Sequence, residues 1–231
     1  MPALTVADSF PERAGTTLYL VRHGQTEYNR KGIVQGRRVD SALNGTGRRQ
    51  AEALAARFAD ASLDALYTSA MRRARQTARP VAARHPGLSV HPDEDLEEMS
   101  WGRFEGEPPT NDVRDALDDI KTDWRKGRLG RAARGGGESA LDVQERALRA
   151  MRRIFAEQHA GGTVLVVAHG RFLRVLIASL LPARFGLRAM HRVEHANTGV
   201  NHLAYDARGA CSARLLNCTA HLDAAPQWRV S

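Results

Sequence analysis

The stretch Leu18-Tyr19-Leu20-Val21-Arg22-His23-Gly24-Gln25-Thr26 is a short apolar run that ends in a cation, an imidazole and a glycine. An apolar run of this length is typical of a buried strand. In open α/β sheets the ligand crevice lies beyond the carboxyl ends of the strands. Arg22 and His23 are therefore predicted to face a substrate, and Gly24 is predicted to permit a sharp turn or a backbone position close to a ligand.

The same arrangement occurs again at residues 163–168, a β-branched apolar run that is followed by His169 and Gly170. If the two strands are neighbours in one parallel sheet, His23 and His169 converge on one crevice, with Arg22 beside them. A guanidinium group matches phosphate oxygens in geometry and never loses its charge. The two segments together indicate a phosphoryl group as the ligand.

Length and composition are those of an ordinary globular protein, with 231 residues of which 42% are hydrophobic and 26% charged. We expect one domain over residues 16–231, after a loosely held leader over residues 1–15. No run approaches the ~20 apolar residues of a membrane span, and the first residues lack the basic start and apolar centre of a secretory signal. The sequence therefore predicts a cytoplasmic location and no membrane partner.

The net charge of +8 raises nucleic acid as a partner. The arginines are nevertheless scattered along the chain, without an aromatic-rich platform or a recognisable DNA-reading module. A basic balance also attracts small anionic substrates into a cleft. We therefore expect a small anionic ligand and no nucleic acid.

The cysteines and acidic residues do not indicate a metal. Cys211 and Cys218 have no spacing that suggests zinc, and they are predicted to be packing residues. A metal-dependent phosphatase would need clustered Asp and His ligands, and the aspartates do not cluster in sequence with His23 and His169. We expect no metal and no cofactor.

A third expected strand, residues 63–68, leads into Ser69-Ala70-Met71-Arg72-Arg73-Ala74-Arg75-Gln76-Thr77-Ala78. Ser69 is predicted to be the N-cap of the helix that follows, which would place Arg73 near the helix's positive end and facing the crevice. By residue type alone, an arginine in this basic run would be a solvated surface charge.

These segments, strand-Arg-His-Gly, Ser-x-x-x-Arg-Ala-x-Gln-Thr-Ala and strand-Ala-His-Gly, resemble the histidine phosphatase superfamily, whose fold is that of cofactor-dependent phosphoglycerate mutase. The resemblance runs from about Thr17 to about Leu222. It implies an α/β fold, a three-layer α/β/α sandwich with a mostly parallel central sheet. It also implies that Arg73 is a second phosphate clamp beside Arg22.

The acidic segment of residues 93–106 contains the pattern Leu-x-Glu, then Gly, then aromatic-Glu-Gly. This pattern resembles the acid-bearing segment of the family, which implies that Glu98 is the proton donor. Glu97 is the alternative, because adjacent side chains diverge and only one of the two can face the phosphate.

Residues 27–36 are polar and contain glycine, so they are predicted to form a loop over the crevice. By residue type alone, Asn and Gln in a loop are usually solvated. The resemblance implies that Asn29, Gln35 and Gly36 bind substrate. The full substrate-binding set that it implies is Arg22, Asn29, Gln35, Gly36, Arg73, His169 and Gly170.

Residues 107–137 differ from the rest of the chain, with Pro108-Pro109, an amphipathic piece from Asn111 through Trp124 and three glycines at 135–137. They are predicted to form a helical lid insertion with hinge glycines at its far end. Basic residues of this segment could bind a second anionic group of the substrate, although solvated charge is the plainer interpretation: Arg125, Lys126, Arg128, Arg131 and Arg134.

The predicted chemistry is hydrolysis of small phosphomonoesters through a phosphohistidine on His23, with Glu98 as general acid and base and Arg22, Arg73 and His169 around the phosphoryl group. One alternative is a cofactor-dependent phosphoglycerate mutase. The family's mutases carry Arg and Tyr shortly after the catalytic Glu, whereas Met99-Ser100-Trp101 follows here, which favours hydrolysis. A second alternative is a catalytically inactive interaction domain, which would need no proton donor. The oligomeric state stays open.

Overall fold

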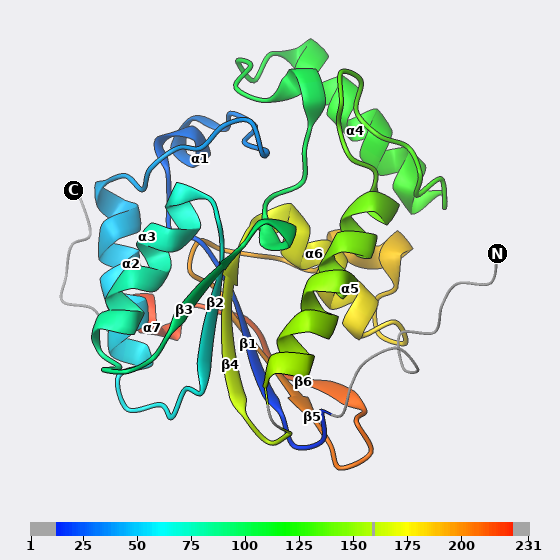
Figure 1. The fold of residues 1–231 in the computed structure, drawn as a ribbon. Helices are drawn as coiled ribbons and strands as arrows, with labels where there is room; N and C mark the ends of the chain where they lie inside the picture. Colours follow the sequence, from blue (N-terminus) through cyan, green and yellow to red (C-terminus); the bar gives the residue numbers. More distant parts are fainter. Residues whose placement is uncertain (1–12, 159, 224–231) are drawn as a thin grey trace.

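The computed structural model describes residues 13–158 and 160–223, and its centre is a six-stranded sheet in the order β3-β2-β4-β1-β5-β6 (Figure 1). Strands β1 to β4 run parallel, β5 runs antiparallel to β1, and β6 antiparallel to β5. The strands are β1 (Thr17–Arg22), β2 (Ala65–Ser69), β3 (Val90–Asp93), β4 (Thr163–Ala168), β5 (Val200–Tyr205) and β6 (Cys211–Cys218). The predicted mostly parallel sheet is confirmed.

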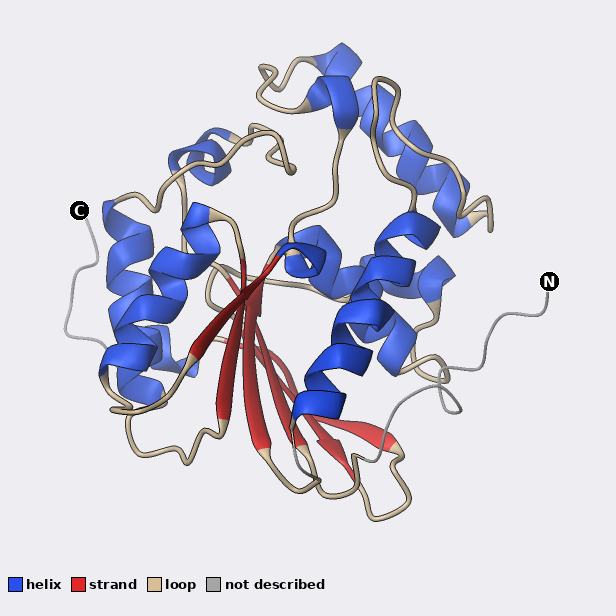
Figure 2. Ribbon diagram, in the orientation of Figure 1, coloured by secondary structure: helices blue, strands red, loops and turns tan. Residues whose placement is uncertain are grey.

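Helices cover both faces of this sheet, as the colouring of Figure 2 makes clear. In Figure 1, α2, α3 and α7 lie on one side of the sheet and α5 and α6 on the other. The helices are α1 (Glu27–Lys31), α2 (Gly45–Arg57), α3 (Arg72–Ala83), α4 (Asn111–Arg125), α5 (Ala140–Glu157), α6 (Gly170–Leu180) and α7 (Ala220–Asp223). Short 3₁₀ turns are η2 (Glu94–Leu96), η3 (Gly102–Phe104) and η4 (Leu187–Arg192). The predicted three-layer sandwich is therefore confirmed.

The central strands are apolar along their length because both of their faces are covered. Leu20 and Val21 are each fully buried, and they belong to two different core clusters. Successive side chains of a strand point to opposite faces, so a strand between two helical layers needs apolar residues at nearly every position. The apolar run of β4 follows the same rule.

Strands β1 and β4 are direct neighbours, with Arg22 opposite Ala168 in the parallel register. The backbone N–H of His23 donates to the carbonyl of Ala168 across 3.0 Å. The two strand-His-Gly segments therefore end side by side at one edge of the sheet, as the sequence predicts for neighbouring strands.

Gly24 is needed for a close backbone approach, but the neighbour is a helix. A Cβ at Gly24 would lie 2.6 Å from the carbonyl oxygen of Gly47 in the first turn of α2. This contact packs the end of β1 against α2. The close approach is therefore to protein backbone, and the predicted proximity of Gly24 to a ligand stays a prediction.

The segment of residues 27–36, predicted as a loop, begins with the short helix α1. Thr26 and Asn29 form a capping box, in which Thr26 Oγ1 accepts from the Asn29 N–H and Asn29 Oδ1 accepts from the Thr26 N–H. The helix ends at Gly32, whose φ of 69° is left-handed. The prediction is wrong for these five residues because the cap compensates for their polar composition.

The amphipathic piece predicted in residues 107–137 is helix α4, which stands above the sheet at the top of Figure 1. Its Trp124 is buried and its ring lies 5.7 Å from that of Trp101. Gly135 and Gly136 both have positive φ, 79° and 83°. The helix of the predicted insertion is present, and its motion as a lid stays a prediction. Residues 1–12 of the predicted leader lie outside the described residues.

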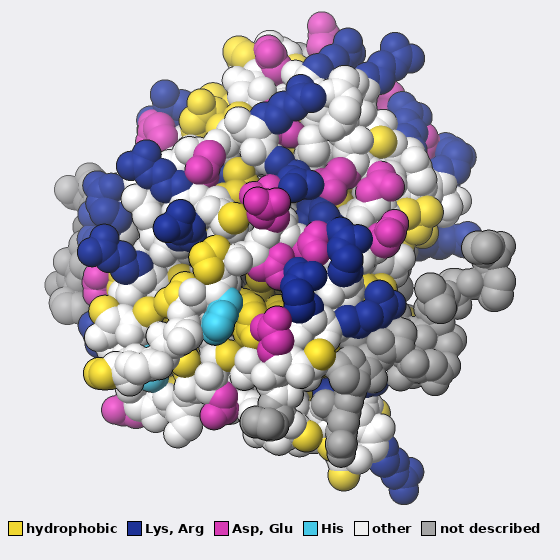
Figure 3. Space-filling view, viewed as in Figure 1, with side chains coloured by type: hydrophobic (Ala, Val, Ile, Leu, Met, Phe, Trp, Pro, Cys, Tyr) yellow, Lys and Arg dark blue, Asp and Glu magenta, His cyan; other side chains and the backbone are white. Residues whose placement is uncertain are grey.

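Acidic and basic side chains alternate on the face shown in Figure 3. Among the ion pairs of the described residues, Arg149 and Arg153 pair with Asp95, and Arg153 also pairs with Asp93. On this face the positive charge is therefore dispersed among carboxylates. Within the described residues, no helix combines the length and apolar character needed to cross a membrane.

Candidate active site

The imidazole of His23 has one ring nitrogen occupied and the other available. Nδ1 lies 2.7 Å from the carbonyl oxygen of Gly24. A carbonyl only accepts hydrogen bonds, so the neutral ring carries its proton on Nδ1 and leaves the Nε2 lone pair bare. Burial, followed by the charges of Arg73 and Arg22, holds the pKa of His23 well below the usual histidine value. At neutral pH the ring is therefore uncharged, as a nucleophile requires.

His169 is fully buried, and its ring lies 5.1 Å from that of His23. Its Nδ1 accepts from Arg73 Nε across 3.1 Å, and its Nε2 lies 2.8 Å from the Ser69 hydroxyl. Because Nδ1 accepts, the neutral ring carries its proton on Nε2 and donates it to Ser69 Oγ. Both ring nitrogens of His169 therefore have protein partners.

Ser69 does not cap helix α3, and that prediction is wrong. The helix begins at Arg72 with Met71 at the N-cap position and no side-chain cap. Ser69 is instead the last residue of β2, where its hydroxyl accepts from His169 and from the Met71 N–H. The Ser69 hydroxyl therefore accepts a long-range hydrogen bond from His169 in place of the local hydrogen bond of an N-cap.

Arg73 still lies in the first turn of α3, and its side chain is fully buried. Besides bonding His169, its guanidinium donates to the carbonyl oxygens of Val39 at 2.8 Å and Gly36 at 3.4 Å. None of the ion pairs among the described residues includes Arg73. A buried guanidinium bonded only to neutral groups is prepared for an anion.

Arg22 lies beside the same space. Its Nη1 donates to the carbonyl oxygen of His195 across 2.8 Å, while its buried Nε has no hydrogen-bond partner within the described part of the chain. Burial lowers the pKa of Arg22, with Glu98 acting in the opposite direction. Arg22 and Arg73 thus provide two cations next to His23.

Glu98 is 8% exposed, and its carboxylate lies at the N-terminus of α6. Its oxygens accept from the backbone N–H groups of Arg171 at 3.1 Å and Phe172 at 2.9 Å. Free N–H groups at a helix N-terminus are natural partners of a carboxylate. The adjacent Glu97 instead forms an ion pair with Arg37. Glu98 is the one of the two that lines the cavity of the site, which is where the sequence-based choice places it.

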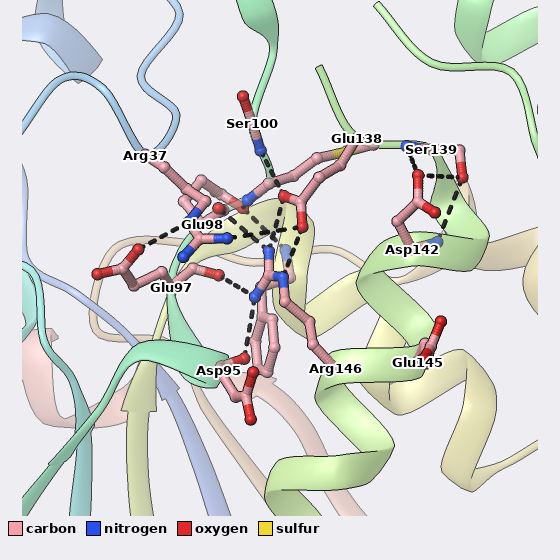
Figure 4. Close-up of polar contacts among 12 residues, drawn as sticks. Arg37, Asp95, Glu97, Glu98, Ser100, Glu138, Ser139, Asp142, Glu145 and Arg146 are labelled. Carbon is pink, nitrogen blue, oxygen red and sulfur yellow. Dashed lines mark hydrogen bonds and ion pairs between the residues drawn. The ribbon is translucent and has the colours of Figure 1, made fainter. Parts of the chain in front are cut away.

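The segment that carries Glu98 is held by Arg146 of α5, as Figure 4 shows. The guanidinium of Arg146 donates to the carbonyl oxygens of Asp95, Glu97 and Glu98 at 2.9, 2.7 and 3.1 Å. It also pairs with Glu138, whose carboxylate accepts from the Ser100 N–H. This partly buried ion pair fixes the backbone on both sides of the Glu98 side chain.

Asn29 and Gln35 reach the cavity from the segment after β1. Asn29 Oδ1 accepts from Thr26 and Asn197, which leaves its amide nitrogen as the available donor. Gln35 has both ends of its amide engaged, with Nε2 donating to Thr26 and Oε1 accepting from Ser41. Asn29 can therefore donate to a ligand. The amide of Gln35 is already engaged, so Gln35 contributes only to the wall of the cavity.

The two predicted glycines differ in position. Gly170 lines the cavity at the start of α6. Gly36 is not a lining residue; its carbonyl accepts from Arg73, and a Cβ there would lie 2.3 Å from the Glu105 carboxylate. Gly36 thus borders Arg73 in this structure.

One cavity of about 230 Å³ brings most of the predicted residues together. It is lined by Arg22, His23, Asn29, Gln35, Arg73, Glu98 and Gly170 from the predicted set, and His169 lies behind Arg73. Further lining residues that sequence reasoning missed are Val34, Trp101, Leu117, Lys121, Arg171, Arg174 and His195. Arg171 and Arg174 had a visible signal, since they interrupt an otherwise apolar helix; His195 had none.

His195 is a buried histidine whose Nδ1 faces the Asn201 amide nitrogen at 3.4 Å. Burial and the nearby charges of Arg174, Arg22 and Arg171 lower its pKa to about 3. The ring is therefore neutral beside the cavity, and its carbonyl orients Arg22.

The basic residues predicted in the lid are not used alike. Arg128 and Arg131 both pair with Asp123. Arg125 lines a second, smaller cavity, whereas Lys126 and Arg134 line neither of these two cavities.

Among the described residues, no three His, Cys, Asp or Glu side chains are grouped so that they could hold a metal ion.

A larger hollow of about 1110 Å³ lies between α2 and α3. It is lined mainly by alanines and arginines and includes none of the residues around His23. Its wall offers His221 as its one histidine, whose pKa is lowered to about 4 by burial and then by Arg57. The smaller cavity is therefore the candidate active site.

Comparison with known proteins gives consistent results over most of the chain. A family profile described as "Histidine phosphatase superfamily (branch 1)" matches residues 18–219. The chain is 31% identical over 185 residues to "Phosphoglycerate mutase-like protein 4" of Arabidopsis thaliana, covering 80% of this chain and 77% of that protein. It is 35% identical over 170 residues to "Glucosyl-3-phosphoglycerate phosphatase" of Mycolicibacterium vanbaalenii, covering 71% and 73%. The solved structure of Bacillus stearothermophilus YhfR superimposes with a TM-score of 0.76 at 34% identity, covering 90% of this chain and 99% of that one.

Proposed function

The chain belongs to the histidine phosphatase superfamily and is a phosphoric monoester hydrolase, and we propose that it acts without a metal ion, through a phosphohistidine on His23 with Glu98 as general acid and base. The observation that carries this proposal is the bare Nε2 of a neutral, buried His23 between Arg22 and Arg73. The expected substrates are small anionic phosphomonoesters. A cytoplasmic location stays a prediction.

In the first step, the Nε2 lone pair attacks phosphorus and the bond from phosphorus to the ester oxygen breaks. Arg22 and Arg73 neutralise the phosphoryl oxygens during the transfer, and the Asn29 amide adds a neutral donor. Glu98 gives its proton to the departing ester oxygen, which leaves as an alcohol. The products of this step are phosphohistidine and an ionised Glu98.

In the second step, Glu98 takes a proton from water as the water oxygen attacks phosphorus. The bond from phosphorus to Nε2 breaks, its electron pair returns to the imidazole, and inorganic phosphate leaves. The positive charge that a phosphohydrolase must place against phosphate comes here from guanidinium groups, which hold it without a metal.

His169 has a different place in this mechanism. Its ring nitrogens bond Arg73 and Ser69, so we assign it as a positioning residue that aims Arg73 at the phosphoryl group. Gly36 supports Arg73 in the same manner. The contact of His169 with substrate that the family resemblance implies stays a prediction.

The test is phosphate release by the wild-type chain and by Glu98→Gln, with two leaving groups of different basicity. For an alkyl phosphate, Glu98→Gln is expected to lower kcat by about 10²–10⁴-fold, because the alcohol needs a proton. For p-nitrophenyl phosphate, the formation of phosphohistidine should be far less affected, since nitrophenolate leaves unprotonated. An equal loss for both leaving groups in single-turnover measurements would contradict the role of Glu98 as acid.

Metal independence and the mutase alternative are decided in the same assay. Activity should survive exhaustive treatment with a chelator, and restoration only by an added divalent cation would contradict the proposal. Glu97→Gln serves as the matched control for Glu98→Gln, because Glu97 pairs with Arg37 and does not line the cavity. Isomerisation of phosphoglycerate primed by 2,3-bisphosphoglycerate, without net phosphate release, would favour a mutase.

A further inference from the structure

The loop of residues 193–199, which connects η4 with β5, is bonded to the end of β1. The N–H of Thr198 donates to the carbonyl oxygen of Arg22 across 3.0 Å, and the carbonyl of His195 accepts from Arg22 Nη1. Asn197 Nδ2 donates to the carbonyl oxygen of His23 across 3.0 Å. Arg22 and His23 are therefore both held by this loop.

The side-chain amide of Asn197 also determines how the Asn29 amide is turned. Asn197 Nδ2 carries two hydrogens, and besides the His23 carbonyl it contacts Asn29 Oδ1 at 3.3 Å. The same Asn29 oxygen accepts from the Thr26 N–H at 3.2 Å. If the Asn29 amide were flipped, its NH₂ group would face these two donors, which cannot accept a hydrogen bond. The oxygen of Asn29 is therefore fixed toward Asn197, and its Nδ2 remains for the cavity that Asn29 lines.

Thr198, the residue after Asn197, is fully buried and has a strained backbone. Its φ is 56°, in the left-handed region that a β-branched residue rarely adopts. Such a conformation persists only where surrounding contacts compensate for its cost, and it is common at functional sites. Thr198 Oγ1 donates to the carbonyl oxygen of Asn197 across 2.8 Å, while the Thr198 N–H is bonded to Arg22. These two contacts fix the peptide that carries the Asn197 side chain.

His221 of α7 bonds the hydroxyl of Thr198. Its Nε2 lies 3.1 Å from Thr198 Oγ1, and its Nδ1 lies 3.3 Å from Arg57 Nη1. Burial and then Arg57 lower the pKa of His221 to about 4, so the ring is neutral near pH 7. A guanidinium only donates, so Nδ1 accepts and the Nε2 proton is donated to Thr198. The hydrogen bonds from Arg57 to the Asn197 carbonyl therefore share one direction.

We propose that Asn197 is a positioning residue for the reaction at His23, because its amide turns Asn29 so that Asn29 Nδ2 donates to the phosphoryl group. Asn197 does not line the cavity, so its effect on a ligand passes through Asn29. The inference rests on the proposed function, because it assumes that the phosphoryl group lies in the cavity beside His23.

The experiment is a double-mutant cycle that combines Asn197→Ala with Asn29→Ala, with the binding of inorganic phosphate measured by calorimetry. Each single variant is expected to bind phosphate about tenfold more weakly, the effect of one hydrogen bond to a charged ligand. The double variant should also lose only about tenfold, because both residues act through the same donor. A loss of about a hundredfold in the double variant would overturn the inference, since the two residues would then act independently. Unchanged affinity in Asn197→Ala would also overturn it.

Ser69→Ala is the matched control for this cycle. Ser69 bonds His169, which accepts from Arg73, and it shares no hydrogen-bond partner with Asn197 among the described residues. The losses of Asn197→Ala and Ser69→Ala should therefore multiply in their double variant. Losses that do not multiply for this pair either would indicate a general disturbance and overturn the inference.

Thermal unfolding verifies that each variant of the two cycles folds. If Asn197→Ala does not fold, Asn197→Asp takes its place, because it keeps the size of the side chain and replaces the donor with an acceptor. Asn197→Asp should weaken phosphate binding by at least as much as expected for Asn197→Ala. This loss should again be smaller in the Asn29→Ala background than in the wild type.

The side-chain amide signals of Asn29 in ¹⁵N NMR spectra separate failure of the inference from failure of the proposed function. Their absence in Asn29→Ala identifies them. Inorganic phosphate should shift these signals in the wild type, and the shift should be largely lost in Asn197→Ala. Equal shifts in the two proteins, or no shift in the wild type, overturn the inference and leave hydrolysis to be judged by phosphate release. A shift that Asn197→Ala abolishes supports the inference even if no phosphomonoester is hydrolysed, in which case only the proposed reaction is wrong.

Discussion

His23 and His169 each follow a buried strand and precede a glycine, and their rings lie 5.1 Å apart. Their hydrogen bonds nevertheless differ. His23 has one nitrogen on a carbonyl oxygen and one bare nitrogen, whereas His169 accepts from Arg73 and donates to Ser69. The difference teaches that a strand-His-Gly segment delivers an imidazole to the edge of the sheet, while the neighbours of the ring decide what the imidazole can do.

The largest expected effect is that of His23→Ala. Removal of the nucleophile should lower kcat for phosphate release by at least about 10⁴-fold, because the proposed route passes through a phosphoryl group on His23. Circular dichroism and thermal unfolding should show that the variant stays folded. Mixtures with ³²P-labelled substrate, quenched in alkaline detergent because the phosphorus–nitrogen bond is acid-labile, should carry the label on His23 in the wild type only. Label on His169 would contradict the different roles assigned to His23 and His169.

His169→Ala should have a smaller effect and lower kcat/KM by about 10²-fold. A misplaced Arg73 would stabilise the transition state less well, but the nucleophile would remain. His169→Gln sharpens the test, since its side-chain oxygen can still accept from Arg73 Nε. Recovery of activity in His169→Gln relative to His169→Ala identifies a positioning role. A loss as complete as that of His23→Ala, in both variants, would contradict it.

Ser69→Ala should lower kcat/KM only by about fivefold, the effect of one hydrogen bond. The hydroxyl holds His169, which in turn holds Arg73, so the effect reaches the substrate through two side chains. Thr68→Ser is a suitable control at the preceding buried position. If Ser69→Ala changed activity more than His169→Ala, the proposed order of contacts would be wrong.

The smallest expected effect is that of pH on the charge of the two rings. Burial and Arg73 lower the pKa of both His23 and His169 well below the usual value, so both rings should remain neutral from pH 8 down through the ordinary histidine pKa of about 6.5. The Cε1 proton signals in NMR spectra, assigned with the two alanine variants, should not move across that range. Because Arg73 opposes a second positive charge, Arg73→Met should raise the pKa of His23. An NMR titration midpoint near pH 6.5 for either ring in the wild type would contradict the expectation that both rings stay neutral.

Local patterns predicted the parts of the fold that depend on which residues are apolar. The continuous apolar runs of β1 and β4 predicted two buried strands whose ends could meet at one edge of a parallel sheet, whereas the three-layer sandwich was implied by the family resemblance. The same reasoning placed Arg22, His23 and His169 together. The choice of Glu98 over Glu97 agrees with the cavity because neighbouring side chains diverge, and only Glu98 reaches the start of α6.

Patterns failed where a long-range partner replaced a local one. Ser69 has the residue type of an N-cap, but its hydroxyl bonds His169, which lies 100 positions along the chain. Polar residues after Thr26 form a short helix because a capping box satisfies its first turn. His195 has no distinguishing pattern and enters the site only because its loop packs on Arg22.

By itself, the sequence determined the layered sheet, the family, and the residue types that gather at the strand ends. Only the tertiary structure decided which nitrogen of each histidine carries the proton, which basic residues have carboxylate partners, and which line a cavity together. The physical reason is one of range. The periodicity of apolar residues within each segment predicts which side chains are buried. Hydrogen bonds and charge compensation instead depend on atoms that only the completed fold brings within a few ångströms.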